Sequence, residues 1–101
     1  MNTLSIDTSS NSEIKVGLKT NEKTDWLVRS IDKQKAQVVL PMIKALLEKH
    51  KLKKEQLEEI EVVTGPGSFT GLRVGTAIAN ALGFTLNISV NGKKQIVVPT
   101  Y

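Results

Sequence analysis

The segment Val63 to Gly75, VTGPGSFTGLRVG, constrains the fold of this 101-residue chain more than any other stretch. It holds four glycines, one proline and a single charged residue, Arg73. A Gly-Pro-Gly sequence suits a tight turn after a strand, and Ser68 or Thr70 can cap the exposed amides of a helix that follows. We therefore predict a strand-to-helix connection whose turn comprises Gly65, Pro66, Gly67 and Ser68.

The predicted helix after this turn has a ridge with almost no side chains. Small residues recur at every fourth position, namely Gly71, Gly75, Ala79 and Gly83. Each glycine inside a helix costs about 1 kcal/mol relative to alanine, so the ridge implies close approach of another helix or the sheet. The opposite side carries apolar residues, and a helix without a polar face is buried all round. In so small a protein, we expect one of the burying surfaces to belong to another chain.

The glycine turn does not match the known phosphate-binding loops. A Walker loop needs a lysine directly after Gly71, and the dinucleotide fingerprint needs a third glycine at position 70, which is Thr70. The helix N-terminus with Arg73 nearby still leaves an anion site open. We favour a structural connection, because most helix N-termini carry only a cap.

Changes of hydrophobic period along the chain predict one α/β lobe over residues 1–101. Short connections make the first three strands antiparallel, and helix crossovers then imply a mixed sheet with helices packed on it. The predicted elements are strands 2–7, 13–19 and 24–31, helix 33–50, strand 60–64, helix 68–83 and a carboxyl-terminal β-hairpin 86–98. The hairpin turns at Asn91-Gly92, and Asp32 caps the first helix, which either starts late or bends at Pro41.

The first predicted helix is apolar over an arc of roughly 200°, although about 100° is enough to cover one sheet face. Its polar side is narrow and includes Gln37, Lys44 and Glu48. Surplus apolar surface on a small domain indicates an interface.

Residues for chemistry are scarce. The absence of cysteine excludes disulfides and thiolate zinc sites and fits a reducing cytosol, and the start of the chain lacks a signal-peptide pattern. His50 is the only histidine, and we expect it to contact helix-terminal carbonyls. The net charge of +4 is moderate, and its lysine runs are interpreted as solvated faces. We predict a cytoplasmic protein with no catalytic residue, no metal and no cofactor.

Three stretches carry a family resemblance: LSIDTSS, LPMIKALLEKHKLKKEQLEEI and TGPGSFTGLRVGTAIANALGF. From Leu4 to about Val90 the chain resembles the TsaB family, also called YeaZ, the dimerisation subunits of the bacterial complex that makes threonylcarbamoyladenosine beside the tRNA anticodon. The Gly65 to Gly75 motif is specific to that family. The Asp-Thr-Ser start is shared with the wider actin-like ATPase superfamily.

The resemblance implies a lobe of the actin-like, ribonuclease H-like fold and a noncatalytic accessory role. Family members pair through two amino-terminal helices with the homologous catalytic subunit TsaD, and the complex recruits the ATPase TsaE. For this chain it implies a TsaD-type partner, a TsaE-type ATPase, a homodimer when the partner is absent, and tRNA contact only through the complex. The implied interface residues are Val38, Val39, Met42, Ile43, Leu46, Thr70, Gly71, Arg73, Val74, Gly75, Ile78 and Ala79.

Two departures from the family pattern qualify these expectations. Lys35 and Ala36 stand where many relatives have His-Ser, which puts any role of that pair in doubt. Relatives also continue into a second lobe, so we expect a one-lobe form, either natural or truncated. Without that lobe, no nucleotide cleft forms within one chain, and Asp7, Thr8 and Ser9 become a vestigial phosphate site. The alternative function is an actin-like nucleotide-binding domain that uses Asp7 and the Gly65–Ser68 turn.

Overall fold

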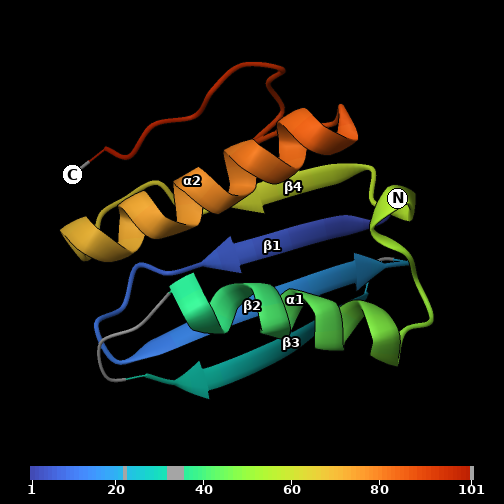
Figure 1. The fold of residues 1–101 in the computed structure, drawn as a ribbon, viewed down its shortest axis with the longest axis horizontal. Helices are drawn as coiled ribbons and strands as arrows, with labels where there is room; N and C mark the ends of the chain where they lie inside the picture. Colours follow the sequence, from blue (N-terminus) through green and yellow to red (C-terminus); the bar gives the residue numbers. More distant parts are fainter. Residues whose placement is uncertain (22, 32–35, 101) are drawn as a thin grey trace.

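A computed structural model describes residues 1–21, 23–31 and 36–100 of the chain. The described residues form one five-stranded mixed sheet with the strand order β3-β2-β1-β4-β5, together with two α-helices (Figure 1). The strands are β1 (Thr3–Asp7), β2 (Glu13–Thr20), β3 (Lys23–Ser30), β4 (Glu59–Val62) and β5 (Ser89–Val90), and the helices are α1 (Ala36–Lys49), the 3-10 turn η1 (Lys54–Gln56) and α2 (Phe69–Leu86). The predicted fold class, a single mixed α/β lobe, is confirmed.

Alternation of apolar residues sets one face of the sheet. β1 pairs antiparallel with β2 and parallel with β4, so that Leu4 lies between Leu18 and Ile60. Successive strand side chains point to opposite faces, so the neighbours two residues along these strands share that face. The result is a continuous aliphatic surface in the middle of the sheet.

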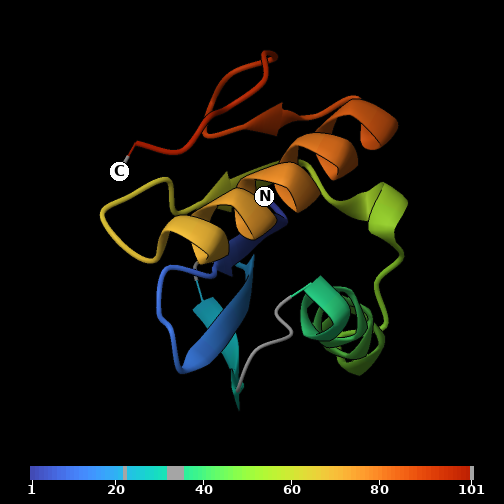
Figure 2. The same cartoon turned by 60° about the vertical axis from the view of Figure 1, so that its left-hand side comes forward.

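Both helices cover this aliphatic face (Figures 1 and 2). The buried side chains of α1, and Ala79 of α2, join those of the strands in one core cluster, against which Ile78, Leu82 and Leu86 of α2 also pack. The opposite face carries alternating polar residues such as Lys15 and Lys19, and no described helix lies over it. The core is therefore a single layer between two helices and one sheet. None of the described helices combines the length and hydropathy needed to cross a bilayer.

The carboxyl-terminal hairpin is shorter than predicted. Helix α2 continues to Leu86 and is ended by Asn87 in the left-handed conformation (φ 56°). Asn91 and Gly92 form the predicted turn, with φ of 52° and 77°, but the pairing beyond it is one bridge between Val90 and Lys93. The second predicted strand is not formed because the chain leaves the sheet and runs along α2 instead.

A side-chain amide replaces the missing strand partner. Asn80 of α2 donates from Nδ2 to the Val97 carbonyl at 2.7 Å and accepts from the Val97 amide at 2.9 Å. Farther on, the Thr100 amide donates to the Thr64 carbonyl at 2.7 Å. Residues 94–100 are thus fixed beside α2 by hydrogen bonds that no strand periodicity indicates.

The start of α1 is described only from Ala36, so the predicted cap at Asp32 and residue Lys35 lie outside the described residues. Pro41 lies inside the helix, as its sixth described residue. The helix therefore runs through the proline, which lacks an amide to donate to the preceding turn.

Candidate partner interface on α2

The Gly65–Ser68 turn is attached to the end of β1. The Ser68 amide donates to the Ser9 carbonyl at 2.8 Å, and the Ser68 hydroxyl accepts from the Gly71 amide at 3.2 Å. Ser68 is thus the N-cap of α2, one of the two caps that the sequence allowed. A Cβ at Gly67 would lie 2.6 Å from Ser9 Cβ, so a glycine is needed where the turn passes the segment that follows β1.

The candidate phosphate residues are engaged with their own neighbours. Asp7 Oδ1 accepts from the Ser9 amide at 3.0 Å and from the Ser9 hydroxyl at 2.6 Å. Thr8 is fully buried, and its hydroxyl donates to the Gly71 carbonyl. The structure brings Asp7, Ser9 and Ser68 together, in an arrangement that closes the loop and joins β1 to α2. Among the described residues, no group of three or more His, Cys, Asp or Glu side chains could hold a metal ion.

The small-residue ridge of α2 faces the sheet. Gly71, Gly75, Ala79 and Gly83 are all buried. A Cβ at Gly75 would collide with the Thr8 hydroxyl and lie 3.5 Å from Val62 Cγ2, and one at Gly83 would meet Val90 Cγ2. The ridge therefore allows α2 to approach β1, β4 and β5 closely, which is the sheet contact that the sequence analysis offered as one explanation.

More than half of the predicted interface residues are buried in the structure. Seven of its twelve residues lie in the protein interior, beneath the helices, and have no accessible side chain to offer a partner: Val39, Met42, Ile43, Leu46, Gly71, Gly75 and Ala79. The prediction failed there because a helical wheel shows how wide an apolar arc is but not which part of it meets the sheet. Five predicted residues keep some exposure: Val38, Thr70, Arg73, Val74 and Ile78.

The outer face of α2 is exposed and almost without charge. Its exposed residues are Phe69, Thr70, Arg73, Ala77, Ala81, Phe84 and Thr85. The two phenylalanines are 56% and 85% exposed, and the Arg73 guanidinium lies 5.4 Å from the centroid of the Phe69 ring. Thr70, Arg73, Val74, Ala77 and Ile78 line a shallow hollow of about 440 Å³ on this helix. We call the seven exposed residues the α2 outer face.

Sequence reasoning missed five residues of the α2 outer face: Phe69, Ala77, Ala81, Phe84 and Thr85. The signal that identifies them is the glycine ridge itself. Once the ridge is assigned to the sheet, residues half a turn away from it must point outward. The predicted interface mixed residues of both sides, because it took the ridge residues Gly71, Gly75 and Ala79 together with Thr70, Arg73, Val74 and Ile78.

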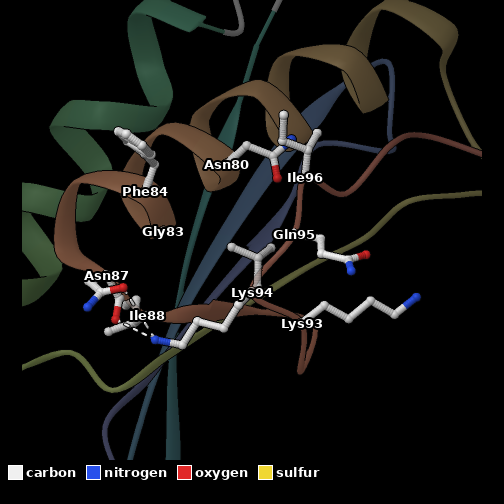
Figure 3. A pocket seen from close by; sticks show the side chains of 10 residues that line it. Asn80, Gly83, Phe84, Asn87, Ile88, Lys93, Lys94, Gln95 and Ile96 are labelled. Carbon is white, nitrogen blue, oxygen red and sulfur yellow. Dashed lines mark hydrogen bonds between the residues drawn. The ribbon is translucent and has the colours of Figure 1, made fainter.

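The carboxyl-terminal segment forms a second hollow at the far end of α2. Its volume is about 250 Å³, and Figure 3 shows Asn80 and Phe84 of the helix, with its C-cap Asn87, on one side and residues 93–96 on the other. Lys94 Nζ donates to the Asn87 carbonyl at 2.8 Å, which ties the segment to the helix end. Ile96 is 79% exposed, so apolar surface continues from Phe84 onto this segment.

One charged cluster joins α1 to β3. Asp25 Oδ2 lies 2.9 Å from Lys49 Nζ and 2.8 Å from His50 Nε2. Hydrogen bonds from Lys49 first, and from His50 second, hold the pKa of the Asp25 carboxyl below its ordinary value. The expectation that the His50 side chain contacts helix-terminal carbonyls is wrong, because the ring contacts a strand carboxylate instead.

Comparison with known proteins identifies the family. The model of the family described as TsaD, tRNA N6-adenosine threonylcarbamoyltransferase, matches residues 29–95. A protein of Buchnera aphidicola subsp. Acyrthosiphon pisum, named tRNA threonylcarbamoyladenosine biosynthesis protein TsaB, is 32% identical over 75 residues, which make up 74% of this chain and 34% of that protein. The chain spans about a third of the length of the curated relatives that it matches first.

Solved structures agree with the sequence relatives. YeaZ from Pseudomonas aeruginosa matches with a TM-score of 0.83 and 29% identity, over 88% of this chain and 41% of that one. A Bacteroides thetaiotaomicron protein with an actin-like ATPase fold matches with a TM-score of 0.51 and 9% identity, over 88% of this chain and 31% of that one, and shows the fold alone. The chain therefore belongs to the family of TsaD, tRNA N6-adenosine threonylcarbamoyltransferase, and within it is a TsaB (YeaZ) family member.

Proposed function

We propose that the chain is a noncatalytic accessory subunit that binds a TsaD-type catalytic subunit and activates it for threonylcarbamoyl transfer to the tRNA adenosine beside the anticodon. The name of the Buchnera relative supports a role in this tRNA modification. The observation that carries the pairing is the α2 outer face, which is exposed and has Arg73 as its only charged residue. In this proposal, tRNA and a TsaE-type ATPase reach the chain through the complex in the cytoplasm.

Desolvation favours the α2 outer face as the docking surface. Burying an unpaired charge costs far more than burying apolar or small side chains, and interface centres are accordingly depleted in charged residues and enriched in aromatic ones. Phe69 and Phe84 supply the aromatic area, and burial of each stabilises a complex by roughly 1.5–3 kcal/mol before the costs of association. Arg73 is held against the Phe69 ring, where its donors remain available to a partner carboxylate.

The outer surface of α1 is less suited to the same role. Its exposed residues include Lys44, Glu48 and Lys49, which a partner would have to desolvate or pair. Among the described side chains of α1, the exposed apolar ones are Leu40, Pro41 and the small Ala45, with Val38 half-buried. We therefore place the centre of the interface on α2 and assign α1 to its margin.

A matched pair of glutamate substitutions tests the proposal. Ala77 is exposed in the hollow on the α2 outer face, whereas Ala45 is exposed on α1, where it lines a small hollow with Leu27. We expect Ala77→Glu to weaken binding to the catalytic subunit of the same organism by about a hundredfold, because it buries an unpaired carboxylate. Ala45→Glu should bind like the unmodified chain.

Sedimentation velocity of the mixed subunits measures both affinities, and thermal unfolding of each variant checks that it is folded. Retention of the one-to-one complex by a folded Ala77→Glu variant would contradict the proposal. Equal loss of binding in both variants would place the interface elsewhere or extend it over α1.

A further inference from the structure

One edge of the sheet is open. β3 is the terminal strand in the order β3-β2-β1-β4-β5 and pairs over eight residues with β2 alone. Figure 1 shows β3 at the lower margin of the sheet, with no other described element beyond it. A long edge strand presents unpaired amides and carbonyls, which are a template for pairing with another strand.

The register with β2 identifies the groups at the free edge. Ser30 lies opposite Glu13, and the next residue, Ile31, donates its amide to the Ser12 carbonyl at 2.9 Å. Hydrogen-bonded and non-hydrogen-bonded pairs alternate along an antiparallel ladder, so odd-numbered residues of β3 direct their amides to β2. The amides and carbonyls that point away from the sheet therefore belong to Thr24, Trp26, Val28 and Ser30.

We propose that this edge pairs antiparallel with the same edge of a second copy of the chain, about a two-fold axis at Leu27. The segment Asp25–Arg29, DWLVR, is self-complementary in that register. Leu27 then faces Leu27 of the second copy, while Trp26 faces Val28 and Asp25 faces Arg29. Opposite charges and aromatic with β-branched residues are the favourable cross-strand pairs.

The other registers that satisfy the outward hydrogen bonds pair less well. A shift that centres the axis on Trp26 places Lys23 opposite Arg29 of the second copy, which sets like charges together. A shift that centres the axis on Val28 places Asp25 opposite Ile31 and Arg29 opposite Leu27, so neither charged side chain faces an opposite charge. A register that places the axis between two residues would set the outward-pointing amides and carbonyls of one copy opposite residues of the other copy whose amides and carbonyls point toward β2. Only the Leu27-centred register pairs every group of the five-residue segment.

Trp26 and Val28 are 51% and 49% exposed, on the sheet face that no described helix covers. The Trp26 indole lies over Gly17 of β2, since a Cβ at Gly17 would lie 2.8 Å from two ring atoms. The ring is therefore placed at the edge before any pairing, which lowers the entropy lost on association. Pairing forms a four-residue apolar strip from two half-exposed side chains of each copy.

The edge charges select this partner over others. Charges on an edge strand usually deter pairing. Asp25 is anchored through Oδ2 to Lys49 and His50, and Arg29, four residues on, forms no ion pair with any described residue. In the proposed register, Asp25 of each copy faces Arg29 of the other copy, which gives one such pair on each side of the axis. The same charges would oppose a strand that lacks the matching order.

A cysteine scan tests the register directly, because the chain has no cysteine of its own. Leu27 and its copy form a non-hydrogen-bonded pair, with a Cα separation of about 4.5 Å that a disulfide can bridge. We expect Leu27→Cys to cross-link into a dimer under mild oxidation. Thr24→Cys is the matched control, because residues 24 of the two copies would lie about 20 Å apart and should not cross-link. Equal cross-linking of both variants, or none at Leu27, would overturn the register.

Amide hydrogen exchange tests the pairing without altering the side chains at the axis. When the unmodified chain is concentrated, the amides of Thr24, Trp26, Val28 and Ser30 should become protected, while those of the odd-numbered residues are protected throughout. Arg29→Glu should raise the dimer dissociation constant about tenfold, and Lys19→Glu, with the same charge change one strand inward, should leave it unaltered.

A chain that stays monomeric at every soluble concentration would overturn the proposal. So would a dimer that Ala77→Glu dissociates and Arg29→Glu does not, since that result assigns self-association to the helices. β3 forms one edge of the sheet, whereas α2 packs on β1, β4 and β5 toward the other edge. Binding of the catalytic subunit and self-pairing therefore use separate surfaces. Failure of one leaves the other to its own experiment.

Discussion

The two helices on the aliphatic face of the sheet are built in opposite ways. α1 directs large side chains inward, with Val39, Met42 and Leu46 buried, and carries lysine and glutamate outward. α2 directs glycine and alanine inward and carries two exposed phenylalanines outward. Helix α1 is thus held by the volume that it buries, and α2 by its close approach to the sheet.

This difference explains how a helix without a polar face persists in a small domain. Close approach of α2 places its backbone against Thr8, Val62 and Val90, so that the glycine ridge itself covers this part of the sheet. Leu72 is the large side chain that α2 buries completely, and both of its phenylalanines lie on the outside. A helix that has this arrangement offers a partner a surface that is cheap to desolvate, whereas α1 offers the ordinary charged exterior of an amphipathic helix.

The largest effect is expected where α1 depends on volume. Met42→Ala removes a side chain that is 1% exposed and should lower the free energy of unfolding by about 3 kcal/mol, through lost burial and a residual cavity. Leu40→Ala, at a residue that is 53% exposed on the same helix, should cost less than about 1 kcal/mol. Urea unfolding of both variants gives the comparison. Equal losses would mean that α1 is not held by its inner side chains.

A smaller effect of unusual sign is expected where α2 depends on close approach. Helix propensity alone predicts that Gly75→Ala stabilises by about 1 kcal/mol. Because the added Cβ meets the buried Thr8 hydroxyl, we expect a net loss of about 1 kcal/mol or more. Ala77→Gly, on the exposed side, measures the propensity term within the same helix. A stabilised Gly75→Ala variant would show that α2 does not approach the sheet closely.

The smallest effect concerns the charged contact that anchors α1 to β3. The folded-state pKa of Asp25 lies below its ordinary value of 3.8, because Lys49 and His50 hold the charged form. Its contribution is therefore present above that value and is lost as the pH falls from 3.8 through the lowered folded pKa. The stability difference between the unmodified chain and Asp25→Asn should shrink over that range. A difference that is constant through acid unfolding would contradict the assignment.

The spacing of hydrophobic residues and the residues at the turns predict most of this fold. Alternation in EIKVGLKT, the three-and-four spacing of the first helix and the Asn91-Gly92 turn reflect local rules that tertiary packing here respects. The missing second strand of the hairpin could not be predicted from such local patterns. Its hydrogen bonds go to the Asn80 side chain, 17 residues away, and no local pattern records such a partner. His50 likewise meets Asp25 only because the sheet brings β3 beside the end of α1.

The sequence indicates that the second helix has a candidate interface, but it does not indicate which residues form it. The lack of charge in the second helix indicates two burying surfaces, and the structure contains both an inner ridge and an exposed outer face. Which residues belong to which surface depends on the rotation of the helix about its axis. That rotation is fixed by the fit of Gly75 against Thr8, a contact between segments 67 residues apart. Helical spacing alone does not contain it.

The proposed function depends above all on the binding of a partner by the α2 outer face. The most direct measurement is NMR of the isotope-labelled chain as the catalytic subunit of the same organism is added. We expect the largest shift changes and loss of solvent contact at Phe69, Ala77 and Phe84, with little change at Lys44 and Glu48 on α1. Changes centred on α1, or a spectrum that the catalytic subunit leaves unaltered, would contradict it.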